Sequence, residues 1–474
     1  MKQSYLLDIV QALNKDERES FSLFLQSPYF QARSSAKDLL SLYHIILEAA
    51  PDFSEEQLDK KNLYERVFSG TAAIPGKLEK LKSELTRNLK QFALWERYNA
   101  DNNELQTQLD WVAWLRERGM EKRFHQAISK MINQEKEQSE ESLKSYQTSL
   151  ALSKELHEWE SEHNQFRSDL NLSDLIQSLD AYYFNYRTEL VNRYLTQQKG
   201  AQLPNLEWME ASIEVHQQSS LLLNITLKIQ AYLRKDMLLT EEFEELLALI
   251  RNNEKSLSFL MKSQLYAYLR NMGSFLINSG HLNVIPIIHE VHQENLAAGY
   301  LTWDNKIQPT YYLNLVQAAT RAGQHIWAQE FTEAYKDRII GGDENSNFYK
   351  LNIATCLFAA GKWEEALEHV PQIPSSSHYH MMERLLELKI LFELQSDLLE
   401  YKIFAFRKYI ERTAPKAISA KFREMNLNFL NMLIQIIQSP ARDKKRSERL
   451  VERIQSKKAI SERGWLIEKA KALA

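Results

Sequence analysis

The sequence predicts an all-α protein, and three observations support this prediction. Its 474 residues include only 12 glycines and 10 prolines, whereas average usage of the two together is about 12%. A sandwich, a barrel or a doubly wound sheet of this length needs many more turn residues. Apolar residues instead recur at helical spacing along nearly the whole chain, and no segment keeps the two-residue period of a strand.

Composition narrows the class of protein further. Hydrophobic residues make up 44% and charged residues 26% of the chain, which is ordinary for a soluble folded protein. The single cysteine, Cys356, excludes an internal disulfide and fits a reducing compartment. No signal-peptide core and no run of 18 apolar residues occurs. We therefore expect a cytoplasmic protein that does not insert into membranes.

Residues 1–100 predict a compact N-terminal helical cap. A first helix carries an apolar stripe from Tyr5 to Leu13. A second helix over about 15–26 ends before Pro28, because proline disfavours the helical conformation of its predecessor. A further long helix is expected over about 77–98.

Beyond residue 100 the pattern becomes pairs of helices separated by short breaks. We divide this part into long-helix hairpins at 101–260, a repeat region at 261–411 and a basic C-terminal cap at 412–474. The predicted helices lie near 101–118, 120–136, 140–163, 172–198, 206–234, 240–253, 258–279, 283–295, 309–322, 325–337, 346–360, 363–370, 378–394, 397–411, 416–438, 443–456 and 461–472.

One hairpin, within residues 348–370, has a more particular pattern. Gly361 ends its first helix, Trp363 packs in the elbow, and the small Ala366 lets the second helix approach the first closely. The positions that share this pattern are Ile353, Ala354, Leu357, Gly361, Trp363, Ala366 and Val370. The pattern resembles the tetratricopeptide repeat, although Lys350 stands where an aromatic residue is usual.

Two preceding hairpins follow the same pattern less closely. They align on Gly323 and on Gly280, and Gly273 takes the small position in the earlier one. Pro286 fits only if its helix begins close by. The resemblance implies a tetratricopeptide-like α-solenoid, in which each hairpin buries its apolar face on its neighbours.

In such a solenoid the first helix of each pair lines a concave face that binds a protein or peptide. The family geometry assigns to this face Arg270, Ser274, Asn278, Leu313, Gln317, Arg321, Leu351, Thr355 and Phe358. Arginines, amides and hydroxyls on one surface suit the backbone and carboxylates of an extended peptide. The alternative is that these residues form solvated helix faces. We expect a non-catalytic scaffold or adaptor that uses this groove.

Motifs for catalysis, cofactors and metals are missing from the sequence. It contains no Walker loop, dinucleotide fingerprint or nucleophile elbow. His289 and His292 lie one helical turn apart, but the repeat alignment places both on the inward face of a second helix, which favours packing. We expect no catalytic residue, no cofactor and no metal site.

Charge is organised only near the C-terminus. The chain has a net charge of −4, but residues 402–474 hold 18 basic and 7 acidic residues. A basic stripe recurs along one helical face of the segment 442–458, at Arg442, Arg446, Arg449 and Arg453. This stripe supports an alternative function, nucleic-acid binding. It would equally suit docking onto the acidic body of the protein itself or onto an acidic partner. Ion pairs with the interleaved Glu448 and Glu452 would explain it as a solvated helix.

The last predicted helix follows the basic stripe. Its mixed charges and Trp465 suit a terminal helix that covers the final apolar face.

Overall fold

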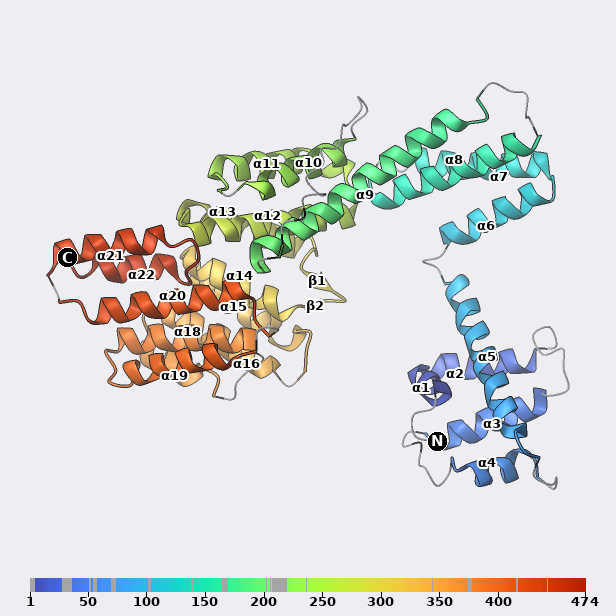
Figure 1. Ribbon diagram of the computed structural model, residues 1–474, viewed down its shortest axis with the longest axis horizontal. Coiled ribbons are helices and arrows are strands. Elements are labelled where there is room, and N and C mark those ends of the chain that lie inside the picture. The colour runs from blue at the N-terminus through green and yellow to red at the C-terminus, as the bar shows by residue number, and fades with distance from the viewer. Residues whose placement is uncertain are drawn as a thin grey trace. The chain divides into compact units, whose positions relative to one another are not determined.

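The computed structural model describes residues 5–27, 36–50, 53, 58–69, 74–100, 104–137, 140–163, 169–201, 203–204, 206, 220–235, 237–342, 344–372, 377–414, 417–440 and 442–474. In these residues the chain forms 22 α-helices, short 3₁₀ turns and one two-stranded sheet (Figure 1). The all-α prediction is confirmed. Pro28 lies outside the described residues.

The chain divides into two compact units, residues 1–130 and 131–474. The first unit contains six complete helices and the start of a seventh, α7 (Glu121–Glu137). The six are α1 (Tyr5–Ala12), α2 (Lys15–Gln26), α3 (Ala36–Glu48), α4 (Lys60–Val67), α5 (Lys77–Tyr98) and α6 (Glu104–Glu117).

Aromatic side chains organise the core of the first unit. Phe21 of α2 is fully buried, and its ring meets Tyr43 of α3 edge-on at 4.9 Å and Phe92 of α5 at 5.2 Å. A capping box fixes where α2 begins, since Asn14 and Glu17 each accept a hydrogen bond from the other's backbone amide. Helices α2, α3 and α5 thereby share one core.

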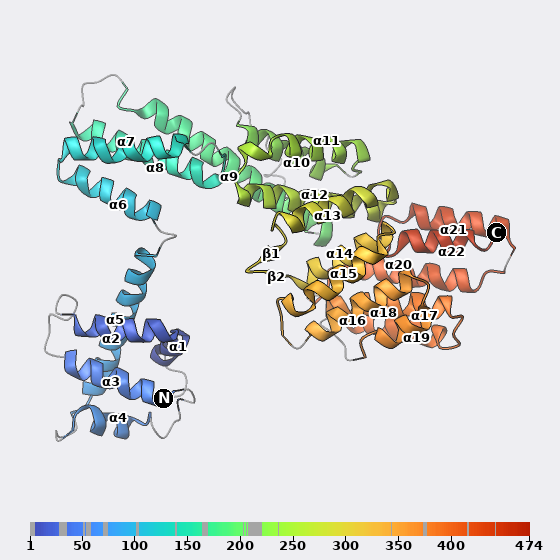
Figure 2. The same ribbon diagram turned by 180° about the vertical axis from the view of Figure 1, so that it is seen from behind.

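The second unit begins with long helices. They are α8 (Leu143–His163), α9 (Leu172–Ala201), α10 (Leu221–Arg234) and α11 (Thr240–Asn252). Helix α9 packs between α8 and α10, and the pair α10–α11 lies beside the following pair (Figure 2). The helix predicted over 206–234 is described only from Leu221 onward, because residues 207–219 lie outside the described part.

Three helical hairpins follow, as the repeat pattern predicts. Their helices are α12 (Phe259–Ser279) with α13 (Ile285–Ala297), α14 (Pro309–Arg321) with α15 (His325–Tyr335), and α16 (Asn345–Ala359) with α17 (Trp363–His369). Pro286 lies in the first turn of α13, where a missing amide costs no helical hydrogen bond.

The three elbows have the same backbone geometry. Gly280, Gly323 and Gly361 adopt positive φ angles of 107°, 76° and 74° directly after the first helix. At Gly361 the next amide, that of Lys362, donates to the Leu357 carbonyl at 3.0 Å, and the glycine amide donates to Phe358 at 3.1 Å. The same two bonds recur at the other two glycines. These two hydrogen bonds define the Schellman motif. Its residue with positive φ is usually glycine, because glycine has no Cβ to clash in that conformation.

One expectation about secondary structure is wrong. Between α13 and α14 a hairpin pairs β1 (Thr302–Trp303) with β2 (Lys306–Ile307). Asp304 and Asn305 form its two-residue turn, with φ angles of 48° and 59°. Asp and Asn tolerate this conformation, and strands of two residues are too short to show a period.

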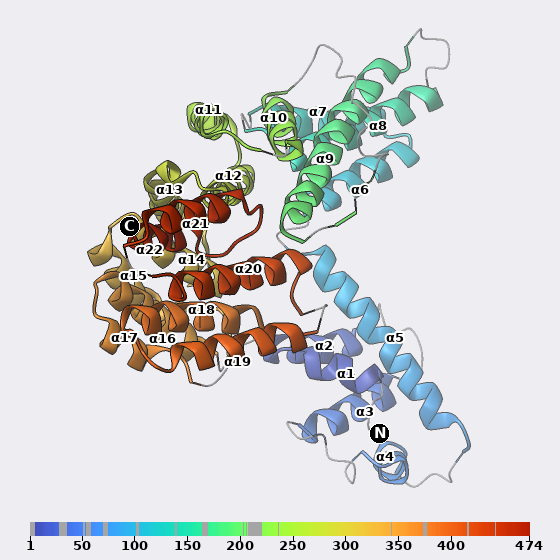
Figure 3. The ribbon, with the colours of Figure 1, turned by 60° about the vertical axis from the view of Figure 1, so that its left-hand side comes forward.

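The last helices turn back onto the earlier part of the second unit. They are α18 (Ser377–Glu393), α19 (Leu399–Arg412), α20 (Ala420–Ile437), α21 (Lys444–Ser456) and α22 (Arg463–Lys471). Helices α21 and α22 stack beside α20 (Figure 3). Helix α20 also contacts α9, where the Lys421 ammonium bonds the backbone carbonyl of Lys199. No helix in the described ranges is long and apolar enough to cross a membrane.

Candidate functional site

Three of the nine residues assigned to the groove are in the interior. Arg270 is 6% exposed, Leu313 2% and Leu351 3%. Their helix faces pack against neighbouring helices, so these side chains are closed to a ligand. The Arg270 guanidinium donates to the Asn295 side chain of α13 and stands over the Tyr311 ring at 5.4 Å. The groove assignment needs correction at these positions.

The other six groove residues are exposed or half-buried. The hydroxyls of Ser274 and Thr355 donate to backbone carbonyls four residues earlier in their own helices, at 2.9 and 2.8 Å. Asn278 and Arg321 contact the segment 461–464 directly, and Phe358 lies under Lys389, which pairs with Glu462 of that segment. Gln317 is half-buried.

Glu462 is the centre of this contact. It adopts a left-handed backbone conformation, with φ of 51°, just before α22. Its carboxylate pairs with Arg321 of α14 and with Lys389 of α18, each at 2.9 Å. The Lys389 ammonium also lies over the Phe358 ring of α16, 4.9 Å from its centroid. One carboxylate thus joins the C-terminal segment to α14 and α18, and Lys389 in turn contacts α16.

The electrostatics of Glu462 follow from this arrangement. Its side chain is 17% exposed. Burial by itself raises the pKa of Glu462, but the charges and hydrogen bonds of Lys389 and Arg321 outweigh burial and lower the pKa to about 2. The carboxylate is therefore ionised at neutral pH and holds two cations in place.

Arg463 extends the contact to the first hairpin. Its Nε donates to the Asn278 carbonyl, in the last turn of α12, at 2.9 Å. Its Nη1 donates to the carbonyls of Ile454 and Gln455 at 2.8 and 3.0 Å. A cation is favoured there, because the carbonyls at a helix C-terminus carry partial negative charge. Arg463 joins the ends of α12 and α21.

The C-terminal helix covers an apolar surface, as its sequence suggests. The Trp465 ring meets Phe392 edge-on at 5.2 Å, and its Nε1 donates to Glu393 at 3.0 Å. Lys469 pairs with the same glutamate at 2.7 Å. Sequence reasoning did not assign Glu462, Arg463 or Lys389 to a site, because no local pattern distinguishes them from the other charged residues of these helices.

The histidines of α13 belong to a buried polar cluster. His289 is 5% and His292 7% exposed, and the His289 ring meets Trp327 edge-on at 5.0 Å. Burial, then the charge of Arg270, lowers the pKa of His292 to about 3. Among the described residues no group of three or more His, Cys, Asp or Glu side chains is placed to hold a metal ion. The positive charge of the nearby Arg270 guanidinium also disfavours binding of a metal cation to these histidines.

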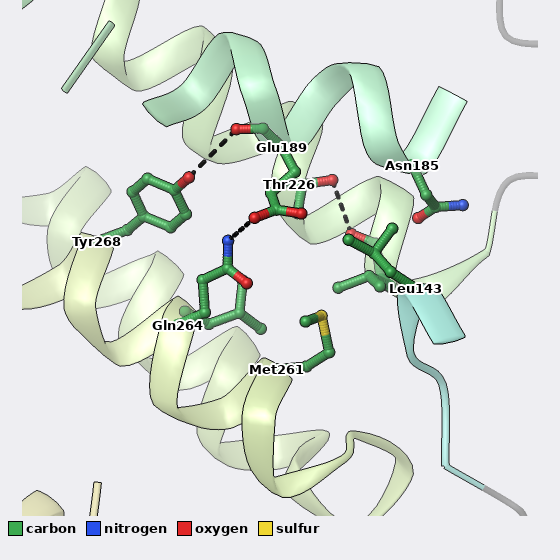
Figure 4. Close-up of a pocket in the computed structure, with 9 residues that line it drawn as sticks. Leu143, Asn185, Glu189, Thr226, Met261, Gln264 and Tyr268 are labelled. Atoms are coloured by element: carbon green, nitrogen blue, oxygen red, sulfur yellow. Dashed lines mark hydrogen bonds between the residues drawn. The ribbon is translucent and has the colours of Figure 1, made fainter. Parts of the chain in front are cut away.

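A cavity about the size of one water molecule lies where α8, α9, α10 and α12 meet (Figure 4). Glu189 is its charged residue, 5% exposed, and it is held by Arg193 and by the Gln264 amide. The Tyr268 hydroxyl donates to the Glu189 carbonyl at 3.4 Å. Because these polar groups bond one another and the space is so small, the cavity suits helix packing better than substrate binding.

The basic stripe lies on and beside α21. Arg446 is half-buried, and its Nε donates to the Ser439 hydroxyl at 3.1 Å. Arg442, Arg449 and Arg453 are exposed. Within the described ranges none of these four arginines forms an ion pair, so the expected pairing with the interleaved glutamates is not observed.

The chain was compared with protein-family models, with the curated proteins and with the solved structures, and none of the three comparisons found a match.

Proposed function

We propose that this chain is a non-catalytic scaffold or adaptor whose hairpins stack into a tetratricopeptide-like solenoid. The shared Schellman elbows and the packing of α14 against α16, the first helices of successive hairpins, support this arrangement. We also propose a cytoplasmic setting, in keeping with the single cysteine, which is buried.

The proposed ligand is an acidic segment of a protein, bound by Arg321 and Lys389. The observation that carries this proposal is Glu462, a carboxylate in a non-helical segment that these two cations hold at 2.9 Å. A partner that presents a carboxylate in a similar turn can form the same ion pairs with Arg321 and Lys389. In this proposal the segment 461–464 occupies the site until a partner replaces it.

A peptide competition experiment tests the proposal. The probe is a fluorescein-labelled synthetic peptide with the sequence of residues 459–471, added to full-length protein and followed by fluorescence polarisation. We expect the Glu462→Gln chain to bind this peptide at least tenfold more tightly than the wild-type chain, because its own segment, without the carboxylate, opens more often and competes less for the two cations. A second peptide with glutamine in place of the glutamate is the control. Equal affinity of the two peptides for the Glu462→Gln chain would show that no carboxylate is recognised.

A second candidate function is nucleic-acid binding through residues 442–458. It is favoured by the exposed arginines of the basic stripe, which make no ion pair among the described residues. This proposal expects salt-dependent binding of a 20-nucleotide RNA or a DNA duplex. Binding should be lost when Arg442, Arg446, Arg449 and Arg453 are changed to glutamine. Absence of a mobility shift at low salt would eliminate this candidate.

A further inference from the structure

Helix α9 exposes an unusually regular row of large apolar side chains. They are Leu172, Ile176, Leu179, Tyr183, Tyr186 and Leu190, which are between 41% and 55% exposed. Their spacing alternates between four and three residues along this helix, which lies beside α8 (Figure 1). An average period of 3.5 residues defines the a and d positions of a coiled coil. We refer to this row as the α9 seam.

The opposite side of α9 fixes the orientation of the helix. Thr188, Val191 and Asn192 are buried there, and the Asn192 amide donates to the Thr226 carbonyl of α10 at 2.8 Å. Helix α9 also packs against α8 and, near its C-terminal end, against α20. Because these contacts hold one face inward, α9 cannot rotate to bury the seam, which faces outward.

The seam supplies most of the area that a stable protein interface needs. Aromatic side chains such as the two tyrosines bury about 150–250 Å² each. With the lower end of that range applied to the leucines and the isoleucine, the six half-exposed side chains present roughly 500 Å² of surface. The largest apolar patch on a typical monomer is about 300–600 Å² and often functional. Two such seams facing each other bury roughly 1,000 Å² before flanking residues are counted, close to the lower limit of about 1,200 Å² for stable interfaces.

We propose that the α9 seam pairs with the α9 seam of a second copy of this chain, as a parallel two-stranded coiled coil. The heptad assignment places Ile176, Tyr183 and Leu190 at a positions and Leu172, Leu179 and Tyr186 at d positions. In its first layers an isoleucine at a lies between leucines at d, the combination that favours parallel dimers. Identical residues then meet in each layer, and no charged residue occupies the seam. In this pairing Arg187, beside the seam, faces Tyr182 of the partner subunit, an arrangement that allows a cation–π contact between the guanidinium and the ring.

The test measures the mass of the full-length protein in solution. Sedimentation equilibrium should give a dimer for the wild-type chain. The double variant Ile176→Glu and Tyr183→Glu should weaken dimerisation by about 100-fold or more, because it buries charge in two central layers. The control is Leu260→Glu in α12, since Leu260 is 69% exposed and lies outside the seam. It should remain dimeric.

A cysteine at the seam tests the pairing directly and does not depend on a destabilising change. Cys356 is buried, so Leu179→Cys adds one accessible thiol to each chain. Parallel pairing puts the two new thiols in one layer, and mild oxidation should link two chains. A monomeric wild-type chain, or a double variant that is folded by circular dichroism and still dimeric, would overturn the proposal. Failure of the Leu179→Cys chains to link would overturn the parallel pairing.

Discussion

Replacing Glu462 by glutamine removes the charge that holds the C-terminal segment against α14 and α18. Glutamine has nearly the same volume as glutamate, so packing is preserved and only the carboxylate is lost. Arg321 and Lys389 then lose their shared partner, and Lys389 is only 13% exposed. We expect residues 461–474 to open locally far more often than in the wild-type chain.

The magnitude follows from the pKa of Glu462. A fall from 4.5 to about 2 corresponds to roughly 3 kcal/mol, because each pKa unit is worth about 1.4 kcal/mol. Solvent screening is small, since the side chain is 17% exposed. The folded pKa lies below the ordinary value, so this stabilisation is fully present above pH 4.5 and is lost as pH falls through about 2.

Hydrogen exchange read by mass spectrometry measures this opening. At pH 7 the amides of 461–474 in the Glu462→Gln chain should exchange up to about 300-fold faster than in the wild-type chain. Glu468→Gln is the matched control, because Glu468 is on α22 and is 68% exposed. Its expected effect is within threefold. The wild-type chain alone should lose this protection between pH 4.5 and 2, after correction for intrinsic exchange rates. Equal exchange in the Glu462→Gln and wild-type chains would refute the reasoning.

Three further predictions concern stability and reactivity. Gly361→Ala should lower the free energy of unfolding, measured by urea denaturation, by about 1–2 kcal/mol, because φ is 74° at this residue. The control is Gly342→Ala, where an added Cβ meets open space, and it should change this free energy by less than about 0.5 kcal/mol. Equal effects of the two substitutions would contradict the elbow geometry. Gly273→Ala should destabilise the packing of α12 against α13, since the added Cβ would overlap the Ile288 side chain. Adding Ile288→Ala should recover part of the lost free energy of unfolding. If the effects of the two substitutions simply add, the clash is not the cause. Burial raises the pKa of Cys356 to about 11, so iodoacetamide should label this thiol only in the unfolded chain. Rapid labelling of the native protein at pH 7.5 would contradict this expectation.

Local signals predicted the helices well because helix boundaries depend on neighbouring residues. The helix predicted over 363–370 spans Trp363–His369, and the one predicted over 443–456 spans Lys444–Ser456. The glycine elbows were equally readable, since a left-handed residue after a helix is a local requirement. The hairpin at 302–307 escaped prediction because it has too few residues to show a period.

The candidate site was only partly predictable. Arg321, one of the predicted groove residues, pairs with Glu462 of the C-terminal segment, and Phe358 lies under Lys389. Arg270 and Leu313 belong to the same predicted faces but are buried. Periodicity finds the face of a helix, but which neighbouring helix covers each part of that face depends on contacts distant in sequence.

The sequence by itself determined that this chain is helical, where most of its helices begin and end, and where its elbows turn. These properties depend on hydrogen bonds between residues three to five positions apart. Only the tertiary structure decided that Glu462 meets Arg321, 141 residues earlier in the chain, and that the α9 seam faces outward. Pairings over such separations depend on how the helices stack, and no local pattern records that stacking.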